Sequence, residues 1–368
     1  MQHLRSAEEY RHLAEAAVCR SQADWLVGMN ATRAYTTKYF KKLTVGRVQT
    51  PTLAMLVERA GQISNFQKEK YFNVELDCDG IPAVKPKIFD PDEAEQLRSR
   101  CQGSEAIVTA VKETEKKVKA PKLYDLTTLQ REANRIYGMT AKQTLDTAQS
   151  LYEKKLITYP RTDSQYLTED MEQTARNVVR QIYEKYQLTG PFDQPEQPDV
   201  KKVMNNSKVT DHHAIIPTME LASCHLDELK SWEEKILFLI AVHTVMAMSK
   251  DHIYQETEIE VECQEEIFKA KGKIVLQDGW KLFENCFKNK DRMAIVDPDQ
   301  EMKERMPKVT QGQTFYAVDA EKTEHFTSPP KPYSEDTLLA AMETAGNKEF
   351  DEDTEKKGLG TPATRAGI

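Results

Sequence analysis

Tyr159 and Arg161 are the side chains of this sequence whose types and spacing most directly suggest chemistry. They lie in LITYPRTDS, and Pro160 between them disfavours a helix, so an extended backbone would direct both to the same side. A phenol with a pKa near ~10 needs a nearby cation to attack a phosphate, and a guanidinium fork matches phosphate oxygens. The spacing is compatible with nucleophilic attack on a phosphodiester, but taken by itself a Tyr-Pro-Arg run is more often a packed loop.

The stretch TDHHAIIP holds a second chemically suggestive group, His212 and His213. Adjacent residues share no helix face and lie on opposite sides of a strand, so the two imidazoles are a poor metal pair, and we predict no metal site in this chain. One of them could serve a phosphate as hydrogen-bond donor or proton shuttle. A surface pair satisfied by neighbouring backbone stays open as the alternative.

Three further stretches, DWLVGMNATR, VGRVQTP and GLGTPATR, combine glycine with hydroxyl and arginine side chains. Glycine permits close approach of a backbone, and hydroxyl and guanidinium groups donate to phosphate oxygens. Each stretch is weak evidence by itself, because short Gly/Thr/Arg runs are common at turns.

Composition limits the class of protein. The 368 residues are 30% charged with a net charge of -8, which argues against nucleic-acid binding by bulk charge, so any such contact must be local. Acidic runs such as FDPDEAEQ are interpreted as solvated faces. No apolar run approaches the ~20 residues that span a bilayer, and the N-terminus does not resemble a secretory signal. Six cysteines without a C-x-x-C pair predict reduced, structural thiols in a cytoplasmic protein.

Apolar periodicity predicts the elements that must position these groups. We expect a first helix from Ser6 toward Ala34 and a strongly apolar helix over 226–248, at the centre of a helical block. Residues 188–208 are rich in proline and predict an exposed loop. Predicted strands cover 71–78, 106–118, 253–263, 271–280 and 314–326. Predicted helix signals are capping boxes at Ser6, Thr127 and Thr140, N-caps at Thr50 and Ser334, and a stop at Gly138.

This order of elements predicts a multidomain α+β protein in which a helical domain is inserted into a β-containing domain. The expected boundaries are a helical segment at 1–64, a discontinuous β-rich domain at 65–122 and 251–328, the inserted helical domain at 123–250, and a return to the first helical domain at 329–368.

Taken together and in order, DWLVGMNATRA, VGRVQTPTL, LITYPRTDS, DHHAIIPT and GLGTPATRAGI resemble the type IA DNA topoisomerases, most closely the bacterial topoisomerase III branch. The resemblance covers essentially the whole chain. It implies a toroidal core in which the β-rich domain is an arch and the inserted helical domain is a gate that carries the nucleophile.

The resemblance also implies roles for individual residues. Tyr159 corresponds to the nucleophile that forms a 5′-phosphotyrosine bond, Arg161 to its phosphate-stabilising partner, and His212 to a histidine near the scissile phosphate. The residues implied to bind single-stranded DNA are Arg20, Asp24, Arg33, Arg47, Gln49, Thr50, Asp163, Ser164, Thr361, Thr364 and Arg365.

The implied partners are single-stranded and underwound DNA, with no ATP, since no G-x-x-x-x-G-K-[ST] motif is present. Magnesium is expected in an acidic N-terminal domain of a longer parent protein, and no cofactor is expected in this chain. The chain alone is expected to bind single-stranded DNA without full activity. We expect a monomeric, cytoplasmic, nucleoid-associated bacterial protein without membrane contact, and a helicase partner stays open. The alternatives are a metal-dependent phosphoesterase, which would need further Asp/His clusters, a tyrosine nicking enzyme, which would need spaced histidines, and a non-catalytic single-strand-binding scaffold.

Overall fold

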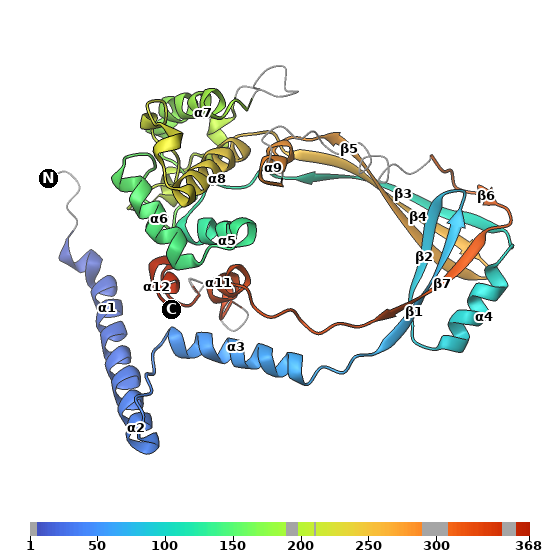
Figure 1. Cartoon of the computed structure of the whole chain (residues 1–368), viewed down its shortest axis with the longest axis horizontal. Helices are drawn as coiled ribbons and strands as arrows, with labels where there is room; N and C mark the ends of the chain where they lie inside the picture. Colours follow the sequence, from blue (N-terminus) through green and yellow to red (C-terminus); the bar gives the residue numbers. More distant parts are fainter. Residues whose placement is uncertain (1–5, 189–197, 210, 289–307, 348–357) are drawn as a thin grey trace.

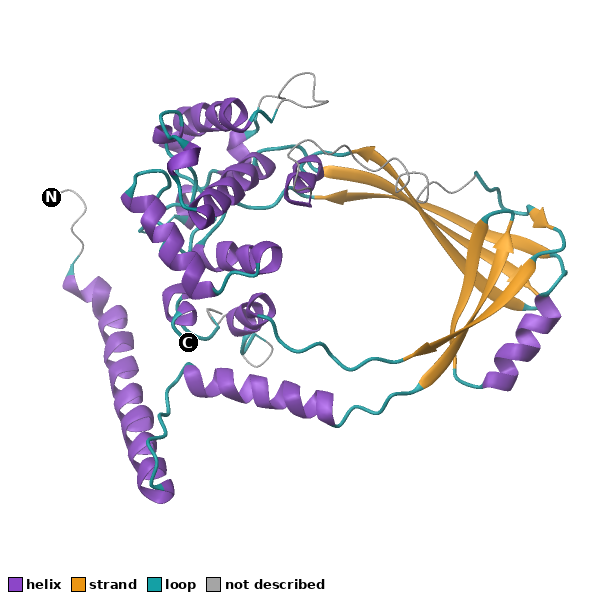
Figure 2. Cartoon of the chain, in the orientation of Figure 1, coloured by secondary structure: helices purple, strands orange, loops and turns teal. Residues whose placement is uncertain are grey.

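The computed structural model describes residues 6–188, 198–209, 211–288, 308–347 and 358–368. Most helices gather at one end of the molecule, and the strands lie at the other end together with one helix, as Figure 2 shows. Each end has its own buried apolar cluster, one within the helical block and one between the sheet and a single helix. The mixed α+β class expected from the sequence is confirmed, whereas the toroidal closure stays a prediction.

The N-terminal helices form a rod that stands apart from the rest in Figure 1. Ser6 and Glu9 form the predicted capping box, and α1 (Arg11–Ala23) continues through a π-helical turn (Asp24–Met29) into α2 (Asn30–Tyr39). None of these helices contains a buried residue, and large apolar side chains such as Trp25 are exposed. The rod therefore draws little stability from packing within the described part of the chain.

Helix α3 (Gln49–Ser64) begins before the predicted N-cap, so the assignment of Thr50 was wrong. The N-cap is Val48, and the backbone N–H of Thr50 already donates to the carbonyl of Gly46 over 3.2 Å. The Thr50 hydroxyl accepts from the N–H of Gly46 at 3.0 Å. Pro51 tolerates this earlier start because the first-turn amides of a helix need no helical partner.

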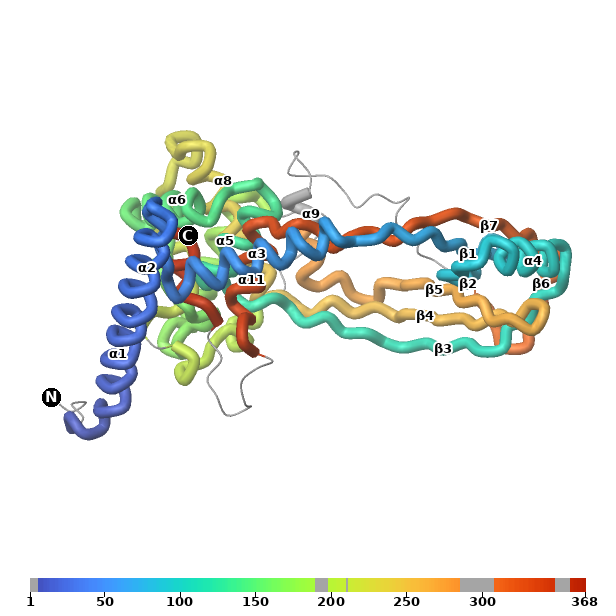
Figure 3. Tube along the Cα trace, turned by 90° about the horizontal axis from the view of Figure 1, so that it is seen from below, coloured from blue at the N-terminus to red at the C-terminus, as the bar shows by residue number. Residues whose placement is uncertain are grey.

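A curled antiparallel sheet forms the other end, in the order β6-β3-β4-β5-β2-β1-β7 (Figures 1 and 3). Each predicted range contains strand residues, although the range 314–326 is interrupted at 316–318 and the strand at 81–88 was not predicted. Helix α4 (Pro91–Cys101) packs against β1 and β7 with Asp90 as its N-cap, where we expected only a solvated acidic run. The strands are β1 (Lys70–Cys78), β2 (Ile81–Ile88), β3 (Ala106–Val118), β4 (His252–Cys263), β5 (Glu266–Gln277), β6 (Thr314–Phe315) and β7 (Asp319–Phe326).

The halves of β3, β4 and β5 nearer the helical block have no buried layer on either face along most of their length. In this part of the sheet, ion pairs connect neighbouring strands and join Lys116 to Glu256 and Lys271 to Glu258. Opposite charges facing one another across strands stabilise pairing, which explains how the highly charged KETEKK run forms a strand.

The helical block contains α5 (Leu126–Tyr137), α6 (Ala141–Glu153), α7 (Glu172–Tyr186), α8 (Ser231–Ala247) and α9 (Lys281–Lys288). Helix α8 is buried almost all round, as predicted, although it begins at Ser231, after a separate 3-10 turn. The Thr140 capping box and the Gly138 stop, with φ of 68°, are confirmed. The box expected at Thr127 was wrong: Asp125 is the N-cap of α5, because its carboxylate accepts from Thr128 N–H at 2.8 Å.

The prediction of an exposed loop over 188–208 was wrong at Val200 and Val203. Both are buried in the core of the helical block on a short 3-10 turn, while residues 189–197 lie outside the described residues. Apolar residues spaced three apart can share one side of such a turn, which the surrounding proline-rich composition concealed.

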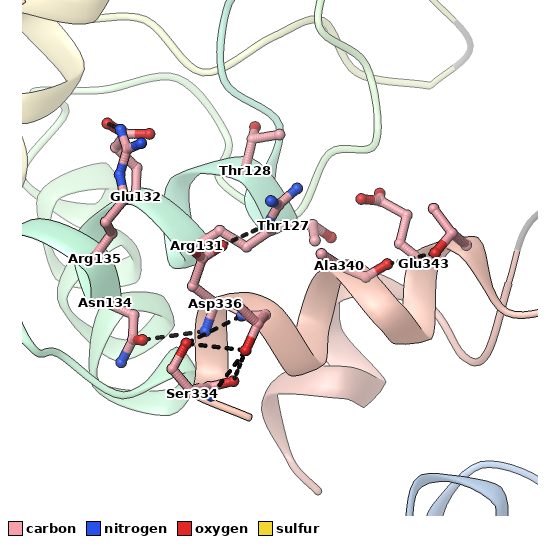
Figure 4. Close-up of polar contacts among 12 residues, drawn as sticks. Thr127, Thr128, Arg131, Glu132, Asn134, Arg135, Ser334, Asp336, Ala340 and Glu343 are labelled. Carbon is pink, nitrogen blue, oxygen red and sulfur yellow. Dashed lines mark hydrogen bonds and ion pairs between the residues drawn. The ribbon is translucent and has the colours of Figure 1, made fainter. Parts of the chain in front are cut away.

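The C-terminal helices α11 (Glu335–Thr344) and α12 (Pro362–Ala366) pack on α5 and α6. Ser334 caps α11, as predicted. Figure 4 shows α11 alongside α5, where Arg131 Nε and Asp336 Oδ1 lie 2.8 Å apart and Asp336 N–H donates to Asn134 at 3.1 Å. In the described part of the chain, no helix has the length and apolar character needed to cross a membrane.

Candidate active site

The loop 156–162, which carries Tyr159 and Arg161, lies against the segment 212–217, which carries the histidine pair. The chain leaves α6 through Lys155, whose φ of 62° turns it out of the helix. Thr158 N–H then donates to the carbonyl of Ile216 at 3.0 Å, and an antiparallel bridge forms one residue earlier. Two motifs that are distant in the sequence therefore lie side by side.

The ring of Tyr159 contacts two other aromatic rings. Its centroid lies 4.4 Å from that of His212, with the planes inclined by 50°, and 5.3 Å from that of Tyr152, which meets it edge-on at 73°. Tyr159 is half-buried and His212 is exposed. Sequence reasoning missed Tyr152, because a tyrosine on an amphipathic helix gives no signal of its neighbour.

Two cavities meet at Asp211 and His212, which line both of them. The first has a volume of about 300 Å³ and includes Tyr159 and His213. The second, of about 250 Å³, is lined by Arg161, Thr162, Asp163, Thr361 and neighbours. The structure thus places the predicted tyrosine and arginine in two cavities that share the predicted histidine, with Asp163 and Thr361 from the predicted DNA-binding set in the second cavity. Asp211 was not among the predicted site residues, although it stands in the same motif.

Thr162 fixes the histidine segment to the tyrosine loop. Its side chain is buried, and its hydroxyl donates to the carbonyl of His212 at 3.0 Å and accepts from Ser164 N–H at 3.1 Å. Its own carbonyl accepts from Leu126 N–H at the start of α5. Both segments are therefore held to one helix end, a positioning role that the sequence did not reveal.

Ser164 and Arg365, both predicted to bind DNA, are buried. The Ser164 hydroxyl donates to the carbonyl of Lys208 at 2.9 Å. Arg365 donates to the carbonyl of Leu359 at 2.8 Å, lies 3.6 Å from the carboxylate of Glu343, and has its pKa lowered by burial. Neither side chain reaches the surface in this arrangement, so as DNA contacts they would require a rearrangement. The Thr361 and Thr364 hydroxyls lie 2.9 Å apart in the cap of α12.

The predicted DNA-binding residues of the N-terminal rod form a separate group. Asp24, in the π-helical turn, holds Arg47 in a two-point contact with an Nη2–Oδ2 distance of 2.8 Å. The hydrogen bond from Arg47 lowers the pKa of Asp24, and Arg47's own pKa is raised in return. The remaining predicted residues, Arg20, Arg33, Gln49 and Thr50, are exposed. None of these residues lines either cavity beside Tyr159.

Among the described residues, no group of three or more His, Cys, Asp or Glu side chains is placed to hold a metal ion. The cysteines with described side chains are free thiols, and burial raises the pKa of Cys78 and Cys101 to about 12. These thiols stay protonated at neutral pH, as expected of structural cysteines.

The curled sheet with an inserted helical block, which carries a tyrosine and an arginine in cavities that share a histidine, matches the fold of a type IA DNA topoisomerase. Full-length topoisomerase I from Thermotoga maritima superposes with a TM-score of 0.67 at 25% identity, over 96% of this chain and 55% of that one. A family model for DNA topoisomerase matches residues 8–368, and this chain belongs to that family.

Curated relatives agree with this assignment. DNA topoisomerase 3 of Bacillus subtilis is 39% identical over 100% of this chain and 52% of its own length. The enzymes of the same name from Bacillus licheniformis and Staphylococcus epidermidis are 38% and 37% identical over 99% of this chain. The chain therefore spans about half the length of the curated relatives it matches. The family membership favours the topoisomerase interpretation over the phosphoesterase and the nicking enzyme.

Proposed function

We propose that this chain carries the strand-cleaving site of a type IA DNA topoisomerase of the topoisomerase III branch, with Tyr159 as the nucleophile. The observation that carries the proposal is the contact between the Tyr159 and His212 rings, 4.4 Å between centroids, beside a cavity that His212 shares with Arg161. A nucleophile, a proton carrier and a phosphate-binding cation then act at one phosphodiester.

In the proposed reaction, the Tyr159 oxygen attacks the phosphorus of a phosphodiester in a DNA strand. A phosphotyrosine bond to the 5′ end forms as the bond to the 3′ oxygen breaks, and that oxygen takes a proton from solvent. His212 accepts the phenol proton and returns it on religation, while Arg161 stabilises charge on the non-bridging oxygens. The phosphotyrosine conserves the bond energy, so no ATP is required.

We further propose that the parent protein passes a second strand through the break in single-stranded or underwound DNA. Strand passage requires the helical block to part from α11 and α12, whose segment supplies Thr361 to the second cavity. The chain by itself binds single-stranded DNA without full turnover, as a monomer in the bacterial cytoplasm close to the nucleoid. Magnesium is the proposed cofactor of the parent protein, and a helicase is an open candidate partner.

The test is transfer of a 3′-labelled single-stranded oligonucleotide to the full protein that the gene encodes, with magnesium present and a denaturing quench. A 3′ label is needed because the 5′ end of the downstream piece becomes attached to the enzyme. We expect transfer in the wild type and none in Tyr159→Phe. Tyr152→Phe is the matched control, since it removes a hydroxyl beside the site and keeps the ring that contacts Tyr159.

Transfer that survives Tyr159→Phe would move the nucleophile to another residue. A folded wild type that binds the oligonucleotide but transfers no label would favour the non-catalytic scaffold.

A further inference from the structure

A cavity of about 490 Å³ lies at the junction between the helical block and the sheet. Its walls come from the connection between β3 and α5, the end of α8 with its connection to β4, the loop that follows the tyrosine motif, and the 3-10 turn at 200–203. It is larger than either cavity at the candidate active site and shares no lining residue with them. We call it the junction pocket; its polar and aromatic lining comprises Lys119, Lys122, Gln165, Tyr166, Lys202 and Asp251.

The junction pocket carries excess positive charge. The carboxylate of Asp251 lies 3.1 Å from Lys117 Nζ and 3.4 Å from Lys202 Nζ, so the charge of the acidic residue that lines the pocket is already neutralised. Among the described residues, Lys119, Lys122 and the nearby Lys208 have no acidic partner within 4.0 Å. In a chain of net charge -8, three such lysines form a local site for an anion, and a polyanion gains most from several cations at once.

An aromatic ring stands among these lysines. The Nζ atoms of Lys208 and Lys122 lie 5.0 and 5.6 Å from the ring centroid of Tyr166, which is half-buried. Gln165 adds an amide to the pocket. An aromatic ring flanked by cations suits a nucleotide, because a base stacks on the ring while the lysines receive its phosphates.

The backbone that presents these groups is fixed. The carbonyl of Lys122 accepts from Nε2 of His243 at 2.8 Å, and the His243 ring stacks on Tyr124 at 3.7 Å. Burial lowers the pKa of His243 to about 4, so the ring is neutral at pH 7 and this hydrogen bond involves no buried charge. Ala120 N–H donates to Asp251 at 3.0 Å. Lys119 and Lys122 therefore extend from a preorganised connection rather than from a loose loop.

We propose that the junction pocket is a second binding site for single-stranded nucleic acid, separate from the cleavage site. Lys119, Lys122 and Lys208 bind successive phosphates, and Tyr166 stacks on one base. The carbonyl of Tyr166 accepts from Ala214 N–H at 2.9 Å, which links the pocket wall to the segment that carries His212. The choice of ligand rests on the proposed function, and the site itself rests on the arrangement of these residues.

The test is photocrosslinking of a short oligothymidylate containing 5-iodouracil, followed by mapping of the adducts. The protein carries Tyr159→Phe and no magnesium is added, so no cleavage is involved. We expect an adduct on Tyr166 that is lost in Tyr166→Leu. We expect the Lys122→Ala/Lys208→Ala double variant to bind the oligonucleotide roughly 3- to 10-fold more weakly, with a salt dependence shallower by about 1.4 in log–log slope.

The matched control is Lys235→Ala, which removes an exposed lysine 4.3 Å from the Trp232 ring on α8, outside the junction pocket. It should leave both the adduct and the affinity unchanged. The double lysine variant removes only exposed side chains and is expected to fold. Its affinity for the oligonucleotide therefore still tests the proposal if Tyr166→Leu fails to fold.

Adducts that map only to other residues would overturn the proposal, and so would a double variant that behaves like Lys235→Ala. Inorganic pyrophosphate that binds the pocket with no Tyr166 adduct would also overturn it, leaving a simple anion site. Because this measurement needs no phosphotyrosine, failure of the label-transfer test and failure of the junction pocket are distinguishable.

Discussion

The Tyr159 and His212 rings lie 4.4 Å apart between centroids, although they belong to different segments of the chain. Thr158 and Thr162 hold these segments together through hydrogen bonds of 3.0 Å to Ala214 and His212 carbonyls. The two rings are therefore brought together by hydrogen bonds from threonine side chains of one segment to the backbone of the other.

His212→Ala should lower the rate of DNA cleavage by roughly 100-fold in single-turnover label transfer, because proton transfer by a positioned side chain typically contributes 10²–10⁴-fold. His213→Ala is the control for which histidine acts. The Nδ1 atom of His213 lies 2.9 Å from the carbonyl of Ala214, so its ring has a backbone partner. A larger loss in His213→Ala than in His212→Ala would exchange the roles of the two residues.

Arg161→Lys should reduce cleavage by about 10-fold and Arg161→Ala by roughly 100-fold, mainly in the rate rather than in DNA affinity. Lysine keeps the charge and loses the fork that matches two phosphate oxygens, whereas alanine loses both. Arg180→Lys on α7 is a control at an exposed arginine remote from both cavities. Equal activity of Arg161→Ala and wild type in single-turnover label transfer would contradict the phosphate role.

Glu233 should stabilise the helical block at neutral pH and lose that effect in acid. Burial raises its pKa, but hydrogen bonds from Lys154, Ser150 and the Lys230 N–H outweigh burial and lower the pKa from 4.5 to about 2. Because the folded pKa is depressed, the stabilisation is present above pH 4.5 and disappears as the pH falls toward 2. The difference corresponds to roughly 3 kcal/mol.

Urea unfolding of wild type and Glu233→Gln between pH 7 and pH 2 measures this effect. The two proteins should differ by about 3 kcal/mol at pH 7 and converge at low pH. A difference that is constant with pH would show that the glutamate acts through packing instead of its charge.

The ion pair between Arg131 and Asp336 should help to hold α11 on α5. Arg131→Gln and Asp336→Asn should each speed hydrogen exchange in α11, with a coupling free energy of about 1 kcal/mol in a double-mutant cycle, since the pair is partly shielded from water. The Arg135–Glu132 pair lies within α5 and is the matched control, with an expected coupling of about 0.3 kcal/mol. Zero coupling between Arg131 and Asp336 would mean that other contacts attach α11, such as the hydrogen bond from Asp336 N–H to Asn134.

The sequence by itself determined the local features and the family. Strand alternation, the capping signals at Ser6, Thr140 and Ser334, and the stop at Gly138 depend on neighbouring residues, so they can be read without the fold. The motifs around Tyr159 and His212 carried the resemblance that the comparisons confirm. The catalytic and DNA-binding roles assigned through that resemblance stay predictions.

Tertiary structure decided which side chains meet and which are buried. Ser164, Arg365 and Thr361 all have polar side chains, yet the first two are buried while Thr361 lines a cavity. Tyr152, which lies beside the tyrosine loop, and Thr162, which belongs to it, make contacts that composition cannot show. A residue's exposure and its hydrogen-bond partners depend on packing between distant segments, and these contacts are set only when the helical block, the sheet and the C-terminal helices assemble.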